Sequence, residues 1–76
     1  YQARLAALST AQAERSLAEA RSERDRVKAL EARGSASALE LSTAERKLRD
    51  AQDALDKARL QAEQDEALRA VDARGT

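Results

Sequence analysis

The 76-residue sequence has no cysteine, histidine, methionine, tryptophan, phenylalanine or proline, and a single tyrosine. Without cysteine and histidine the chain has no thiol or imidazole chemistry and no zinc site of the usual ligands. Its large apolar side chains, ten Leu, two Val and Tyr1, can line a seam between helices but cannot fill a globular core. No apolar run approaches the length of about 20 residues that spans a bilayer. These absences predict a protein that is not an enzyme and that holds no metal or cofactor.

The charges are numerous but balanced. Fourteen basic and 14 acidic side chains make up 37% of the sequence and leave a formal net charge of zero. Neutral charge with one aromatic residue argues against nucleic acid as a partner. Polar faces of mixed sign without aromatic anchors argue against direct contact of this segment with a membrane. A composition of Ala, Leu, Arg, Glu and Asp is instead typical of long helices and coiled coils.

Apolar residues recur at alternating steps of three and four in two arms of the sequence, which is the heptad pattern of a coiled coil. In the second arm one row of the seam holds Leu and the other holds Ala, so that the helix axes can approach closely. The pattern weakens beyond Ala62, where the next seam position is Asp65 and apolar residues shift to Leu60 and Leu68. The predicted seam consists of Leu17, Ala20, Val27, Leu41, Ala44, Leu48, Ala51 and Leu55.

One break interrupts the helical pattern. Gly34 is suited to the left-handed conformation that ends a helix, and Ser37 with Glu40 three residues later forms a capping box that starts the next helix. So short a connection makes the two helices antiparallel. We therefore predict an all-α fold, an antiparallel two-helix coiled-coil hairpin. Its single domain covers residues 1–76, with a first helix over 1–33, a tip turn over 34–37 and a second helix over 38–74.

The helical pattern is already present at Tyr1 and continues almost to Thr76, so we expect the hairpin to be excised from a larger protein. The first arm has seven basic and five acidic groups and the second has seven and nine, giving +2 and −2. This weak complementarity favours pairing between the arms. With so few large apolar residues a lone hairpin is expected to be marginally stable. We expect it to pack against other copies or to be anchored by the rest of the parent chain.

The spacing of the residues around the turn is similar to that of a known protein family. Arg26 is followed by Leu30 four residues later and by Ser37 seven residues after that, on either side of Gly34. Together with the Ala- and Leu-rich arms, this spacing resembles the hairpin tip of periplasmic adaptor proteins of the HlyD type, also called membrane fusion proteins. Many members have a branched apolar residue before the serine, where this chain has Ala36.

The resemblance implies a part in a tripartite efflux pump or a type I secretion system. In this family the parent chain is anchored at the inner membrane, and the hairpin projects into the periplasm. Several copies, a hexameric ring in the full adaptor, assemble side by side into a funnel. The tips contact a TolC-like outer-membrane channel, while the missing domains contact an inner-membrane transporter. The class of transporter and its substrate stay open. By resemblance, Arg26, Leu30 and Ser37 are the channel-binding residues.

Each tip residue also has an ordinary interpretation. Arg26 lies among charges of both signs and could belong to a solvated face. Leu30 could be the last core residue of the hairpin, and Ser37 could simply cap the second helix. A generic antiparallel coiled-coil spacer or dimerisation module would explain everything except the clustering of these residues at the turn. That alternative remains open from the sequence.

Overall fold

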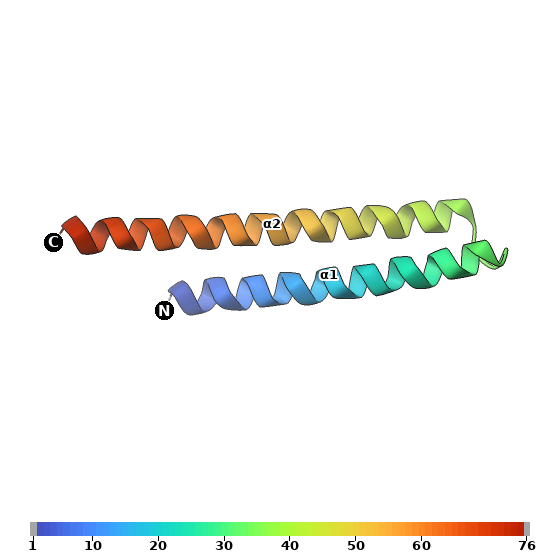
Figure 1. Ribbon diagram of the computed structural model, residues 1–76, viewed down its shortest axis with the longest axis horizontal. Coiled ribbons are helices and arrows are strands. Elements are labelled where there is room, and N and C mark those ends of the chain that lie inside the picture. Colours follow the sequence, from blue (N-terminus) through green and yellow to red (C-terminus); the bar gives the residue numbers. More distant parts are fainter. Residues whose placement is uncertain (1, 76) are drawn as a thin grey trace.

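The computed structural model describes the backbone of residues 2–75 and the side chains of residues 4, 5 and 7–70. The described chain consists of two long helices, α1 (Gln2–Ala32) and α2 (Ala38–Gly75), joined by a short turn. The helices run antiparallel and side by side, and α2 reaches farther from the turn than α1 does (Figure 1). The Cα atoms extend over 64 × 15 × 10 Å. The protein is an all-α helical hairpin, as the sequence predicts.

The two helices form because their residues favour helix throughout. Ala, Leu, Arg, Lys, Glu and Gln, the best helix formers, make up most of both segments, and neither segment contains proline. Helix α1 ends at Ala32, one residue before the expected boundary, and Arg33 lies in the turn. Helix α2 begins at Ala38, the expected residue, and continues to Gly75. The first helix was expected to begin at Tyr1, which lies outside the described residues. The second was expected to end at residue 74, one residue before its observed end at Gly75.

The core is one line of side chains between the helices. Leu17 and Val27 of α1 are buried against Ala44 and Leu55 of α2, and Leu55 is the most buried of them, with 2% of its surface exposed. The other predicted seam residues are half-buried; they are Ala20, Leu41, Leu48 and Ala51. Two helices can cover only the sides that face each other, so the flanks of the seam remain open to solvent.

Packing between the helices is thinner toward their open end. The seam continues from Leu55 to Ala62 and Asp65, which are half-buried and contribute little apolar area. Leu60 and Leu68, to which the apolar pattern shifts in the sequence, are mostly exposed. Leu8 of α1 is mostly exposed as well. Apolar contact between the helices is therefore concentrated in the half of the hairpin nearer the turn.

The turn after α1 has the hydrogen bonds of a Schellman motif. The Ser35 amide donates to the Leu30 carbonyl at 2.8 Å, and the Gly34 amide donates to the Glu31 carbonyl at 2.9 Å. These are the two bonds by which the residues after a helix satisfy its last carbonyls. Gly34 has a φ of +77°, and a Cβ placed there would contact nothing within 4 Å. Glycine is favoured at this position by backbone conformation and not by lack of space.

Ser37 starts the second helix. Its Oγ accepts a hydrogen bond from the Glu40 amide at 3.1 Å, and its carbonyl accepts the first bond of the helix, from the Leu41 amide at 3.1 Å. An N-cap side chain of this kind satisfies one of the amides that a helix start leaves unpaired. Two residues, Ser35 and Ala36, separate the Gly34 stop from the Ser37 start, and this short connection turns the chain back on itself.

Candidate functional site

We call residues 26–40 the tip; they comprise the end of α1, the turn and the first residues of α2. The tip holds all three residues that the resemblance singles out. Arg26 lies two turns before the end of α1, Leu30 lies in its last turn, and Ser37 caps α2. Ala36, which stands before Ser37, is half-buried.

Arg26 is exposed and held in place by a neighbour on its own helix. Its Nη2 lies 2.7 Å from Oε1 of Glu23, and its Nε lies 3.1 Å from Oε2 of the same carboxylate. This is a two-pronged pair one turn apart on α1, with 62% of the Arg26 side chain exposed. A guanidinium has five N–H donors, and the pair uses two of them. The others remain available to an acceptor outside the hairpin, while Glu23 fixes the plane of the guanidinium.

The pair changes the acid–base properties of both partners. The pKa of Glu23 is lowered from its ordinary value of 4.5, chiefly because Arg26 donates hydrogen bonds to the carboxylate, with smaller attractions to the charges of Arg26 and Lys47. The same hydrogen bond raises the pKa of Arg26. Because the folded-state pKa of Glu23 is depressed, the contribution of the pair is present above the unfolded value and is lost as the pH falls through the folded value.

We expect carbon-13 NMR titration to place the carboxyl pKa of Glu23 below 4.5 in the wild-type chain. In an Arg26→Ala variant the pKa should return close to its ordinary value, because the hydrogen-bond donor is gone. Lys28→Ala is the matched control, since Lys28 is an exposed cation of the same helix that does not contribute to the shift. An unchanged Glu23 pKa in Arg26→Ala would show that the pair does not persist in solution.

Leu30 and Ser37 are tied into the turn. The carbonyl of Leu30 accepts from the amides of Arg33 and Ser35, and its side chain is half-buried. The Ser37 hydroxyl accepts from the Glu40 amide and can still donate its own proton outward. Both residues therefore have structural tasks, and each retains a part that faces solvent. Loss of either would disturb the turn as well as any external contact.

A groove runs beside the tip, between the two helices. It has a volume of about 330 Å³, it is open to solvent, and its floor contains the buried Val27 and Ala44. Arg26 lies on its α1 side, and Leu39 and Glu40 lie on its α2 side. The remaining lining residues are Glu23, Thr43 and Lys47. Arg26 thus faces the first turns of α2, whereas Leu30 and Ser37 do not line the groove.

Leu39 is the surface residue of the tip that sequence reasoning missed. It is 76% exposed, more than any other large apolar side chain described. The signal was present in the sequence, because Leu39 lies two residues before the seam residue Leu41 and so cannot share its side of the helix. Leu39 lines both the groove and a second hollow on the outside of α2.

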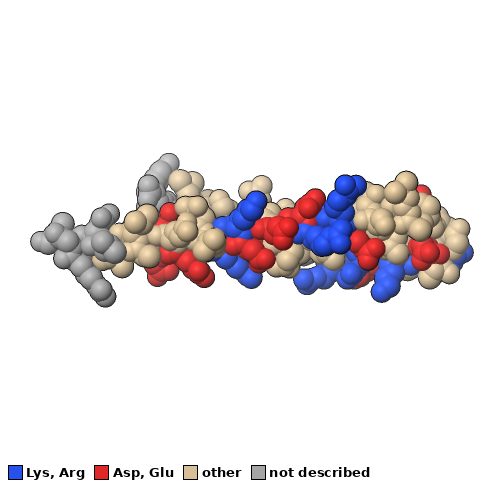
Figure 2. Space-filling model, turned by 90° about the horizontal axis from the view of Figure 1, so that it is seen from above, with Lys and Arg blue, Asp and Glu red and all other residues tan. Residues whose placement is uncertain are grey.

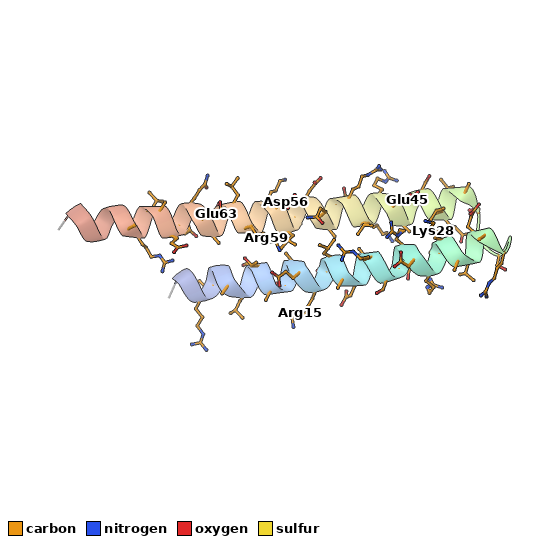
Figure 3. All side chains as sticks on the ribbon, in the orientation of Figure 1. Arg15, Lys28, Glu45, Asp56, Arg59 and Glu63 are labelled. Atoms are coloured by element: carbon orange, nitrogen blue, oxygen red, sulfur yellow. The ribbon has the colours of Figure 1, made fainter. Side chains whose placement is uncertain are left out.

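The rest of the described surface is charged and mixed in sign. One ion pair joins the helices, between Nη2 of Arg59 and Oε1 of Glu14 at 3.8 Å, and Arg59 projects from α2 toward α1 (Figure 3). Within the described residues, no three His, Cys, Asp or Glu side chains are grouped so that they could hold a metal ion. Neither helix, over those residues, has the length and apolarity to cross a bilayer.

Comparisons with protein-family models, with curated proteins and with solved structures find no match to this chain. What this chain can bind is therefore inferred from the arrangement of its tip residues.

Proposed function

We propose that this chain is the hairpin of a periplasmic adaptor of the HlyD type, and that its tip docks onto a TolC-like outer-membrane channel. The observation that carries the proposal is the clustering of an exposed Arg26, a half-buried Leu30 and a helix-capping Ser37 at the one turn of the hairpin. The protein would act as a docking and sealing element of an efflux pump or a type I secretion system. Its place would be the periplasm, with the parent chain anchored at the inner membrane.

Each of the three side chains would make a different interaction with the channel. Arg26 would donate its remaining N–H groups to carbonyls or carboxylates of the channel, with its guanidinium oriented by Glu23. The partly exposed side chain of Leu30 would enter an apolar groove between channel helices. Ser37 would donate its hydroxyl proton to the channel while its oxygen continues to cap α2. Other copies of the hairpin would stand beside it in a ring, and an inner-membrane transporter would bind the missing domains.

The test is binding of the 76-residue chain to a purified TolC-like channel in detergent, by surface plasmon resonance. We expect Arg26→Asp and Leu30→Ser each to weaken binding at least tenfold, because one reverses a charge and the other removes apolar area at the contact. Arg15→Asp and Leu8→Ser are the matched controls, since both residues are exposed and lie far from the tip. Circular dichroism verifies that every variant is helical.

Equal binding by the wild type, Arg26→Asp and Leu30→Ser would contradict this site assignment. Ser37→Ala is a weaker probe, because loss of the cap alone costs about 1 kcal/mol of helix stability.

A second candidate function is a coiled-coil spacer or dimerisation module. It is favoured by the small core, in which four of the described side chains are buried, and by the exposed leucines outside it. This candidate predicts that changes in the seam, such as Leu48→Ala, abolish function in the parent protein while changes at Arg26 and Leu30 have no effect. The two sets of variants therefore distinguish the candidates.

A further inference from the structure

The groove beside the tip has an apolar centre with charged side chains around it. Val27 and Ala44 are buried in its floor, and the exposed Leu39 lies at its edge. A single exposed leucine is ordinary on a protein surface, but Leu39 adjoins an apolar floor that the two helices leave uncovered. Figure 2, which looks onto α2, shows a largely uncharged area at the tip end of the hairpin, whereas basic and acidic groups alternate farther along. An apolar centre with a polar rim is the pattern of a protein interface.

Two charges of opposite sign stand at the two ends of the α2 wall of this groove. Glu40 lies nearer the turn, and Lys47 lies seven residues farther along the helix, a distance of about 10 Å or two helical turns. Both side chains are exposed. Neither takes part in any of the three ion pairs between described side chains. Both charges are therefore available to a partner that lies in the groove.

The α1 wall of the groove presents hydrogen-bond donors. Arg26 uses two of its five N–H groups on Glu23, so the others are left for a partner. The Glu23 carboxylate is already paired with Arg26, and the nearby charge of Lys47 contributes to the lowering of its pKa. Away from the turn, the groove therefore offers cationic donors on both walls. Next to the turn it offers the free carboxylate of Glu40.

We propose that this groove binds one helix of the TolC-like channel, and that Leu39 and Lys47 are further channel-contact residues. The channel helix lies along the groove, with an apolar side chain over Val27 and Ala44 and against Leu39. An acidic side chain of the channel helix faces Lys47, and a basic side chain two turns away faces Glu40. This inference rests on the proposed function, because it names the element of the channel that the tip receives and the chemistry of that element.

A helix fits the charges of the groove better than an extended segment does. Residues seven apart in a helix lie on the same side, about 10 Å from each other, which matches the separation of Glu40 and Lys47 along α2. In an extended segment, residues about 10 Å apart are three apart and point to opposite sides. A helix with a basic, an apolar and an acidic residue spaced over two turns therefore meets the carboxylate, the floor and the ammonium group with one of its sides.

The first test is binding of the 76-residue chain to a purified TolC-like channel in detergent, by surface plasmon resonance. We expect Leu39→Ser to weaken binding at least tenfold, because the contact loses apolar area at its centre. Leu60→Ser is the matched control, since Leu60 is an exposed leucine of the same helix that does not line the groove. Lys47→Glu should also weaken binding at least tenfold, because it places a negative charge opposite an acidic group. Its control is Lys57→Glu, at an exposed lysine outside the groove.

The second test reports which side of the hairpin the channel covers. Because the protein has no cysteine, single cysteines can be placed at Thr43, which lines the groove, and at Lys28, an exposed residue of α1 that does not. Binding of the channel should slow the alkylation of Thr43→Cys by a maleimide at least tenfold, because the bound helix excludes the reagent from the groove. The alkylation of Lys28→Cys should stay nearly unchanged.

The outcomes separate this inference from the proposed function. Undiminished binding by Leu39→Ser or by Lys47→Glu would overturn the inference, and so would a channel that protects the cysteines at positions 43 and 28 equally or protects neither. Each of these results leaves the assignment of Arg26 and Leu30 to be judged by its own variants. A wild-type chain that does not bind the channel would overturn both proposals.

Discussion

Replacing Leu55 with Ala is expected to remove the cooperative unfolding of the hairpin. Leu55 is the most buried side chain described, at 2% exposed, and three other described side chains, Leu17, Val27 and Ala44, are buried with it. Substitution of a buried leucine by alanine costs about 2–5 kcal/mol in other proteins. We expect about 2–3 kcal/mol here, because a void between only two helices opens to solvent and the helices can partly close it. In a hairpin with so small a core this loss approaches the total free energy of unfolding.

Thermal and urea unfolding followed by circular dichroism measures this loss. Leu39→Ala is the matched control, since it makes the same chemical change at a side chain that is 76% exposed. Its effect should stay within about 0.5 kcal/mol. If both substitutions lower the midpoint of unfolding equally, then the contact between α1 and α2 does not stabilise the chain in solution.

Ala44→Leu is expected to destabilise the hairpin even though it adds apolar surface. Ala44 is 4% exposed and lies in the row of small residues near the tip. A larger side chain there must push α2 away from α1 or distort its rotamer, and such overpacking typically costs about 1–3 kcal/mol. The strain is close to the turn, where the Gly34 and Ser37 hydrogen bonds fix the separation of the helices.

The measurement is again urea unfolding, with Ala54→Leu as control. Ala54 is exposed on α2, so leucine there should change the stability by less than about 0.5 kcal/mol. Unchanged or increased stability of Ala44→Leu would mean that the helix axes have room to separate without loss of other contacts. The alanine row would then not set the spacing of the helices.

Much of the fold could be predicted because it depends on local and periodic features of the sequence. Gly34 and Ser37 predict the stop and the start of the helices, and the structure has the Schellman and capping hydrogen bonds there. The helix end differed by one residue, Ala32 in place of Arg33, because the Schellman bonds already involve the amides of Gly34 and Ser35. The seam follows from residue spacing, since side chains three and four apart share one side of a helix.

Less of the candidate site at the tip than of the fold could be predicted from the sequence. Arg26 could be named from its spacing to Leu30 and Ser37, but its pairing with Glu23 could not, because Arg26 has several acidic neighbours within reach and only side-chain geometry selects one. The open groove between Arg26 and Leu39 likewise requires both helices in place. Leu39 counts in the sequence as one apolar residue among many. Leu39 is recognised as exposed once Leu41 is placed in the seam, because the two residues then lie on opposite sides of α2.

The sequence by itself determined the absence of thiol and imidazole groups, the two helices, the turn between them and the residues of the seam. Each of these depends on composition or on contacts within a few residues. Only the tertiary structure decided which side chains the pairing of α1 with α2 leaves outside. It exposed Leu39 and opened a groove beside Arg26. The physical reason is that two helices can each cover only one side of the other, so the position of α1 defines every surface that remains available for binding.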